Sequence, residues 1–171
     1  MGYYDRLVIN IAEGNLSYLS ELYLKLKKPI FALALSILGD YYAAEDIMQE
    51  TFVKVTSNAD SYQKGTNARA WIFSIARNLC LNSLHLKKRE ELNENMTAAG
   101  GNTFEEKVAS AIDFKQLISP LDETEKQIFV LHFYGGLKKT QIAKIMDITP
   151  VNVRAKYSRA LKKLRAGKNK N

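Results

Sequence analysis

The stretch from Gly136 to Arg165 constrains the fold of this chain more than any other, because it predicts two helices joined by a short turn. A short helix is expected over residues 139–146, followed by a turn over residues 147–149. In the second helix, apolar side chains recur at spacings of three and four, which places them on one buried face. This is the pattern of a helix-turn-helix. The side chains of the buried face are Val153, Tyr157, Leu161 and Leu164.

The opposite face of the second helix is cationic. The hydroxyl of Thr149 can cap this helix, and Pro150 fits its first turn, where a missing N–H costs nothing. A helix of roughly sixteen residues is about 24 Å long, enough to lie in a DNA major groove. A solvated helix that is merely basic is the alternative. The cations are Arg154, Lys156, Arg159, Lys162, Lys163 and Arg165.

The composition is that of a globular protein with a polyanionic partner. The net charge of +7 favours nucleic acid. No apolar run approaches the roughly eighteen residues that a membrane span needs, and the first residues show no signal-peptide pattern. We therefore expect no membrane insertion and a cytoplasmic location. Cys80 is the only cysteine, so no intrachain disulfide can form, and we expect Cys80 to pack in the core.

The first 88 residues are predicted to be helical throughout. A short helix ends near Gly14, and a second is expected to be interrupted at Pro29, because proline breaks an interior helical turn. A third helix buries one face and exposes acids on the other, a pattern that suggests a protein partner in so basic a chain. An ordinary solvated face is equally compatible. The exposed side carries Glu45, Asp46, Gln49 and Glu50.

A polar loop from Tyr62 to Ala68 leads into a long helix. Trp71 and Asn78 fall on a face of this helix away from the expected core. Side chains of this kind can stack on, or hydrogen-bond to, an unpaired base. The spacing alone favours the simpler interpretation that Trp71 is a half-buried core residue.

Composition changes over residues 90–112, which are acidic and contain Gly100-Gly101. We interpret this stretch as a flexible linker, most mobile near residues 98–103, with helix resuming by Phe104. It divides residues 1–89 from residues 113–171. In the second part, Asp122 and Glu125 have the spacing of a capping box at the head of a helix. The predicted fold is therefore all-α, with two small helical domains.

The sequence shows no recognisable set of catalytic residues. The two histidines, His85 and His132, lie in different predicted domains. No nucleophile–histidine–acid grouping, metal-spaced cluster or phosphate-binding glycine loop is present. We therefore expect neither an enzyme nor a bound cofactor or metal.

Three segments together resemble a known family: Asp40–Val55, Asn67–Asn78 and Gly136–Arg165. In this order, with the linker between the last two, they are similar to the extracytoplasmic-function group of bacterial sigma factors. That group keeps only the sigma-2 and sigma-4 domains. The resemblance implies a transcription initiation factor that binds core RNA polymerase, directs it to promoters and promotes melting. It also implies that the linker follows the RNA path of the polymerase, that an anti-sigma partner exists, and that the free protein is a monomer.

The resemblance also implies which residues bind each partner. The surface for the largest polymerase subunits would be Asp46, Gln49 and Glu50. The part that captures flipped bases of the minus-10 element would be Tyr62, Lys64, Asn67, Ala68, Trp71 and Asn78. The side chains that face the minus-35 duplex would be Asn152, Arg154, Ala155, Lys156 and Arg159, with Lys162 and Lys163 on phosphates.

Two other classes of protein fit the same residues. One is a helix-turn-helix regulator that binds its operator as a dimer without polymerase. The other is an interaction protein that keeps the sigma fold but has lost promoter activity. Run-off transcription with core polymerase distinguishes all three.

Overall fold

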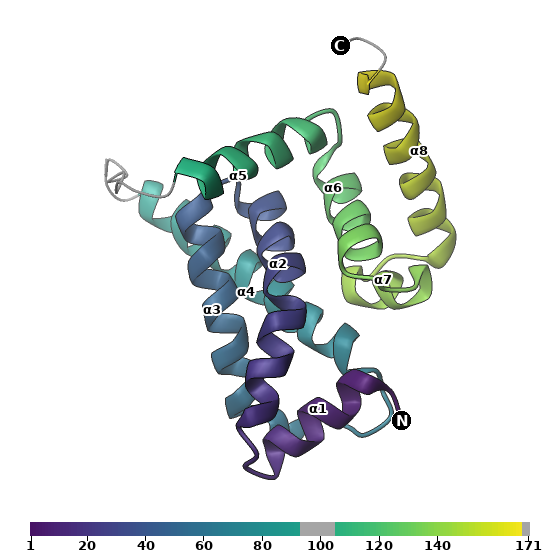
Figure 1. The fold of residues 1–171 in the computed structure, drawn as a ribbon. Coiled ribbons are helices and arrows are strands. Elements are labelled where there is room, and N and C mark those ends of the chain that lie inside the picture. The colour runs from purple at the N-terminus through teal and green to yellow at the C-terminus, as the bar shows by residue number, and fades with distance from the viewer. Residues whose placement is uncertain (93–104, 169–171) are drawn as a thin grey trace.

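The computed structural model describes residues 1–92 and 105–168, and all regular elements in these residues are helical, as predicted (Figure 1). The stretch expected to be most flexible, residues 98–103, and Phe104 lie outside the described residues. No described helix is long and apolar enough to cross a membrane. In chain order the elements are α1 (Tyr3–Ala12), α2 (Ser17–Leu38), α3 (Tyr41–Ser57), the 3-10 turn η1 (Ala59–Ser61), α4 (Ala68–Glu91), α5 (Glu105–Ile118), α6 (Glu123–Phe129), the π-helical turn η2 (Val130–Tyr134), α7 (Lys139–Met146) and α8 (Pro150–Lys168).

Local caps define where the N-terminal helices begin and end. Gly39 ends α2 in the left-handed conformation, with φ 69°, which a glycine adopts without a steric penalty. The carboxylate of Asp40 then accepts a hydrogen bond from the Ala43 N–H at 2.8 Å and caps α3. Asn67 caps α4 by accepting from the Ala70 N–H at 2.9 Å, so α3 and α4 each start at a side-chain cap.

The predicted interruption at Pro29 is wrong, because α2 continues through this residue as one helix. An interior proline removes one backbone hydrogen bond and costs about 3 kcal/mol. Tertiary packing offsets this cost. On either side of Pro29 the same face of α2 is completely buried, with Leu26 and Ile30 both 0% exposed, and burying one such side chain contributes about 1.5–3 kcal/mol.

The C-terminal helices follow the predicted caps closely. Asp122 and Glu125 form the expected capping box at the start of α6. The helix then widens into η2 before Gly135 and Gly136 end it. The hydroxyl of Thr149 accepts a hydrogen bond from the Asn152 N–H at 3.2 Å and caps α8, as the sequence predicted.

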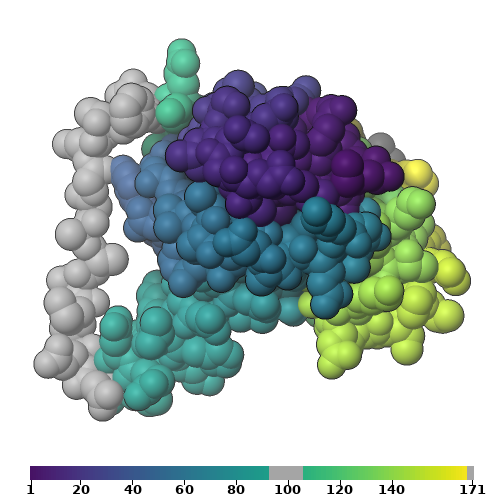
Figure 2. Space-filling model, turned by 90° about the horizontal axis from the view of Figure 1, so that it is seen from below, coloured from purple at the N-terminus to yellow at the C-terminus, as the bar shows by residue number. Residues whose placement is uncertain are grey.

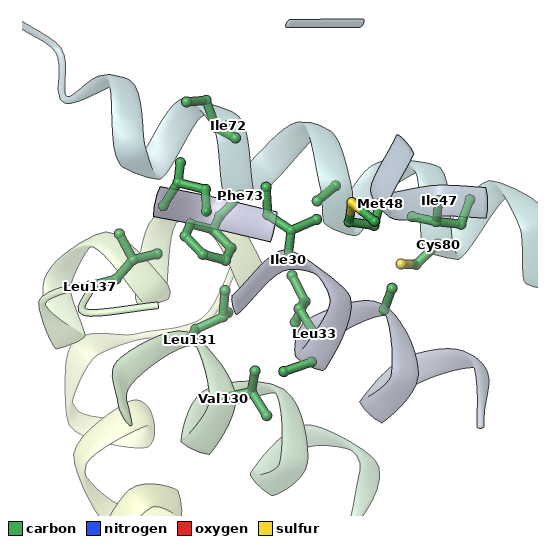
Figure 3. Packing of buried hydrophobic residues seen from close by; sticks show 14 of the residues in the cluster. Ile30, Leu33, Ile47, Met48, Ile72, Phe73, Cys80, Val130, Leu131 and Leu137 are labelled. Carbon is green, nitrogen blue, oxygen red and sulfur yellow. The ribbon is translucent and has the colours of Figure 1, made fainter. Parts of the chain in front are cut away.

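The N-terminal helices α1–α4 and the C-terminal helices α5–α8 share one continuous apolar core. Figure 3 shows Phe73 of α4 pointing toward the segment that carries Leu131 and Leu137. Ile30 and Leu33 of α2 lie beside them in the same cluster. In Figure 2 the surface of the C-terminal residues lies directly against that of the N-terminal helices. The two halves therefore meet along an extensive apolar interface.

Polar contacts also join the two halves. Arg77 of α4 donates through Nε to the Gln127 side chain at 2.8 Å and through Nη1 to the Ile145 carbonyl at 3.3 Å. Lys115 of α5 donates to the carbonyl of Gly39 at 2.6 Å. The contacts of Arg77 join α4 to α6 and α7, and the contact of Lys115 joins α5 to the end of α2.

Cys80 packs in the core as predicted. It is completely buried and lies near Ile47 and Met48 (Figure 3). Burial raises the pKa of its thiol to about 12, because a thiolate is poorly solvated in an apolar environment. At neutral pH the side chain is therefore a protonated thiol that fills space in the core.

Candidate nucleic-acid and protein-binding surfaces

The acidic surface on α3 comprises Asp46, Gln49 and Glu50, and all three side chains are exposed. The helix presents them outward because Ala44, Ile47 and Met48 occupy the buried side. Asp46 and Glu50 are four residues apart, so they lie one above the other on the same side of the helix. The structure therefore gathers the predicted polymerase-binding residues into one patch, whose function stays a prediction.

The six residues predicted to hold the minus-10 element fall into two groups. Tyr62 and Ala68 are buried, at 7% and 0% exposed, and Asn67 uses its side-chain oxygen to cap α4. Lys64 and Asn78 are exposed, and Trp71 is half-buried, as its spacing favoured. The first three shape the loop and the helix start, and the last three offer side chains to a ligand.

Tyr62 is held by a residue that the sequence did not single out. Its hydroxyl donates a hydrogen bond to the carboxylate of Asp5 in α1, and its ring lies 5.3 Å from that of Trp71. Burial and the hydrogen bond to Asp5 raise the pKa of Tyr62 to about 12. The two partners are 57 residues apart in the chain, so no local pattern could have predicted their contact.

Arg69 at the start of α4 is a second residue that the sequence did not single out. Its guanidinium lies 4.7 Å from the ring centroid of Tyr4 in α1 and donates to the Tyr4 hydroxyl at 3.2 Å. It also approaches the C-terminal half. A Cβ added to Gly136 would lie 2.5 Å from Nη1 of Arg69, and Gly136 has φ 65°, a left-handed conformation that glycine adopts without a steric penalty. Helix α1 and the turn after η2 thus both approach Arg69 at the start of α4.

Helix α8 exposes a stripe of cationic and small side chains. Arg154, Ala155, Arg159 and Lys162 are exposed, and Asn152 is half-buried at the edge of the stripe. Val153 and Ala160 are completely buried on the opposite side. The helix thus has one apolar face and one face open to a ligand, as its pattern predicted.

Two lysines of α8, both predicted to face DNA, have acidic partners within the protein. Lys163 Nζ lies 2.7 Å from the Glu125 carboxylate, and Lys156 Nζ lies 3.8 Å from that of Asp122. A hydrogen bond from the Glu125 N–H, together with the two ammonium groups, lowers the pKa of Asp122 below its ordinary value. The assignment of both lysines to DNA stays a prediction, and both have a second role as partners of α6.

His132 has two close partners within the protein. Nδ1 of His132 lies 2.8 Å from the Leu137 carbonyl, and its ring packs edge-on against Tyr157 at 4.7 Å. Within residues 1–92 and 105–168, no three histidine, cysteine or acidic side chains are grouped so that they could hold a metal ion. His132 therefore has a structural role between η2 and α8.

Comparison with known proteins defines the class of this chain. The family model for Sigma-70 region 2 matches residues 22–90, and the model for Sigma-70, region 4 matches residues 112–164. These two regions define a sigma factor, a promoter-specific initiation factor of bacterial transcription that works with core RNA polymerase.

Relatives specify the group within that class. The ECF RNA polymerase sigma factor EcfG of Rhodopseudomonas palustris is 28% identical over 140 residues, covering 79% of this chain and 76% of its own length. The ECF RNA polymerase sigma factor SigM of Bacillus subtilis is 23% identical over 153 residues, covering 86% and 93%. The chain belongs to the extracytoplasmic-function group of sigma factors.

Solved structures share the fold. CnrH in complex with the cytosolic domain of CnrY aligns with a TM-score of 0.72 at 18% identity, covering 98% of this chain and 97% of CnrH. The sigma factor RpoE in complex with the anti-sigma factor NepR, from Bartonella quintana, aligns with a TM-score of 0.68 at 22% identity, covering 86% and 94%. The arrangement of helices in this chain is thus that of known sigma factors.

Proposed function

We propose that the chain uses three separate surfaces to start transcription. The acidic surface of α3 binds core RNA polymerase, the exposed stripe of α8 reads the minus-35 duplex, and the loop before α4 holds unpaired bases of the minus-10 element. The protein acts in the cytoplasm and catalyses no reaction of its own. The observation that carries the proposal is the separation of charge: a chain of net charge +7 exposes acids on α3 and cations on α8.

The acidic surface suits a protein partner. Asp46 and Glu50 would be repelled by DNA phosphates, and their exposure leaves them available for a basic surface. Charge complementarity of this kind steers association and selects the partner. Because sigma factors work with core RNA polymerase, we propose that core polymerase is this partner.

The stripe on α8 suits duplex DNA. Arg154 lies in the first turns of the helix and is exposed, and the N-terminal residues of a recognition helix contact base edges. An arginine bidentate to guanine discriminates by about 1–3 kcal/mol. Lys162 lies two turns further on, where it can attract phosphate. Asn152, Ala155 and Arg159 complete the reading face.

The minus-10 surface combines a polar loop with the start of α4. Lys64 and Asn78 are exposed, and Trp71 is half-buried with its ring 5.3 Å from that of Tyr62. A flipped base costs a few kcal/mol to unstack, which stacking and hydrogen bonds to the base edge must offset. Trp71 offers a ring, and Asn78 offers both a donor and an acceptor.

We further propose the division of labour along the chain. Residues 1–89 serve the polymerase and the minus-10 element, residues 113–171 serve the minus-35 element, and residues 90–112 connect them. The RpoE structure contains an anti-sigma factor, and we extend such a partner to this chain, which we expect to be a monomer when free.

Run-off transcription with purified core polymerase tests the function, on templates selected from a random-sequence pool by the reconstituted holoenzyme. The native chain should direct initiation from specific sites. The double variant Asp46→Lys, Glu50→Lys should keep its helicity, since both side chains are exposed, but lose core binding through charge reversal. Glu13→Lys, Asp113→Lys is the matched control, with the same change of charge at exposed positions after α1 and in α5.

Two results would count against the proposal. Core binding by the α3 double variant as tight as that of the native chain would remove α3 as the polymerase surface. Operator binding by a dimer, with no run-off product, would instead favour a regulator that acts without polymerase.

A further inference from the structure

Two carboxylates at the start of α6 face two ammonium groups of α8. Asp122 caps α6, and Glu125 completes the capping box by accepting from the Asp122 N–H at 3.0 Å. Glu125 also accepts from Lys163 Nζ at 2.7 Å, and Asp122 lies 3.8 Å from Lys156 Nζ. The two lysines are seven residues apart, so they lie on the same side of α8, about 10 Å apart. Helix α6 therefore contacts α8 at two positions along the α8 axis.

The two ion pairs differ in burial. The difference lies in the carboxylates: the side chain of Glu125 is 1% exposed and that of Asp122 is 50% exposed, while their lysine partners are 43% and 21% exposed. A buried carboxylate needs hydrogen-bonding partners, and removal of one partner of a buried pair is strongly destabilising. A long, exposed pair contributes little. The contact between Glu125 and Lys163 is therefore the stronger constraint on α8, and Lys156 is an auxiliary one.

The position of Lys163 on α8 links this constraint to the exposed stripe that we propose reads DNA. Successive residues of a helix are turned by about 100°, which places Lys163 between the buried side, marked by Ala160, and the exposed stripe, marked by Lys162. A rotation of α8 that moved Lys163 away from Glu125 would turn Arg154 by the same angle. The ion pair is thus coupled to the direction in which the stripe faces, together with the buried side chains of Val153 and Ala160.

We propose that Glu125, assisted by Asp122, is a positioning residue for minus-35 recognition: it fixes the rotation of α8 and holds Lys163 away from DNA phosphates. This inference rests on the proposed function of α8 as the DNA-reading helix. It assigns different roles to two adjacent lysines. Lys162, which is exposed and has no ion pair among the described residues, contacts phosphate, whereas Lys163 neutralises Glu125.

Binding of the full chain in its holoenzyme to two duplexes tests the proposal. One duplex is the minus-35 sequence that the native holoenzyme selects from a random pool, and the other is its scrambled version. Each lost phosphate contact reduces the slope of log affinity against log salt by about 0.9. Lys162→Met should show this reduction on both duplexes. Lys163→Met should leave the slope unchanged and reduce discrimination between the duplexes severalfold, because α8 is no longer held.

Glu125→Gln gives the opposite signature. Glutamine still serves the capping box, but Lys163 is released and can reach phosphate, so the slope should steepen by about 0.9 while discrimination falls. Adding Lys163→Met to Glu125→Gln should return the slope to the native value. If Glu125 contributed only to the stability of the fold, Glu125→Gln would leave the salt slope unchanged on both duplexes. Circular dichroism confirms that each variant keeps its helix content, and Lys163→Met with Lys162→Met suffices if Glu125→Gln does not fold.

The possible failures are distinguishable. Equal reductions of slope by Lys162→Met and Lys163→Met in the native background would overturn the positioning role, as would a Glu125→Gln variant with native slope and native discrimination. If Lys162→Met, Lys163→Met and Arg154→Ala all leave binding to both duplexes unchanged, α8 does not read DNA, and it is the proposed function that fails.

Discussion

Tyr62 and Asp5 illustrate how single residues shape the minus-10 loop. The Tyr62 ring belongs to the loop, yet it is buried and its hydroxyl is bound to Asp5 of α1. Lys64, Trp71 and Asn78, which we propose contact an unpaired base, thus lie in a region whose buried side is held by Tyr62. The N-terminal helix is thereby connected directly to the proposed DNA surface.

The pKa of Tyr62 predicts a dependence of stability on pH. Its value of about 12 exceeds the ordinary value of about 10, so the folded protein holds this proton more tightly than the unfolded chain. The resulting stabilisation is complete below about pH 10 and is lost as the pH rises through about 12. Between these limits, the free energy of unfolding should fall more steeply for the native chain than for Tyr62→Phe.

Denaturant titrations at several alkaline pH values measure this difference. At neutral pH, Tyr62→Phe should also be less stable by about 1–3 kcal/mol, because Asp5 loses a buried partner. Parallel curves for the two proteins across the alkaline range would show that Tyr62 does not titrate as described.

We propose that Asn78 hydrogen-bonds the flipped base of the minus-10 element. Asn78→Ala should retain core binding and minus-35 recognition, since the side chain is exposed and lies on α4. It should lose single-stranded minus-10 capture and open-complex formation. Permanganate footprinting of the minus-10 thymines and transcription from a pre-melted bubble template measure these steps, with Asn15→Ala as a control at an exposed position between α1 and α2. Native footprints and initiation in Asn78→Ala would remove its role.

At the scale of the element, the proposed function assigns base contact to Arg154 of α8 and phosphate attraction to Lys162. Arg154→Ala should lower affinity for the selected minus-35 duplex by about 1–3 kcal/mol and change affinity for scrambled DNA far less. Lys162→Ala should weaken binding to both duplexes alike. Equal losses on both duplexes for Arg154→Ala would exclude its base contact. Fluorescence anisotropy at several salt concentrations measures both effects.

The helices also show which features the sequence could predict. The cap at Thr149 and the capping box of Asp122 and Glu125 were predicted, because each depends on residues three apart in the chain. The break at Pro29 was predicted wrongly, because burial of the same helix face on both sides of the proline outweighs its local cost. Local sequence patterns therefore predict where a helix ends better than they predict whether it continues through a proline.

The candidate surfaces follow the same logic. The acidic patch of α3 and the stripe of α8 could be predicted, because helical periodicity alone decides which side chains share a face. The partners of Arg77 and Tyr62 could not, since these contacts join residues 50 and 57 positions apart. Pairing at that range depends on how whole helices pack.

At the scale of the whole molecule, the two halves are too close to read a promoter in this arrangement. Elements at minus-10 and minus-35 are separated by about 25 base pairs, or about 85 Å at about 3.4 Å per pair. A folded body of this length has a radius of gyration of about 15 Å and spans about 40 Å. The proposed division of labour therefore requires the C-terminal helices to separate from the N-terminal helices when both elements are bound.

Arg77 provides a test of this separation. Arg77→Ala removes the contacts with Gln127 and with the Ile145 carbonyl, so the free protein should spend more time open and its radius of gyration in small-angle scattering should increase. Arg89→Ala, at an exposed position of the same helix, should leave the radius unchanged. Equal radii for the native chain and Arg77→Ala would show that the apolar interface alone holds the halves together.

The shared core also has a consequence for synthesis on the ribosome. Leu33 and Leu131 belong to the same buried cluster, but they are 98 positions apart in the chain. At about 5–20 residues per second, Leu33 is made roughly 5–20 s before Leu131. During that interval the nascent N-terminal helices present an uncovered apolar face, on which chaperones and proteases act. Each new copy is therefore most vulnerable just before its C-terminal half emerges.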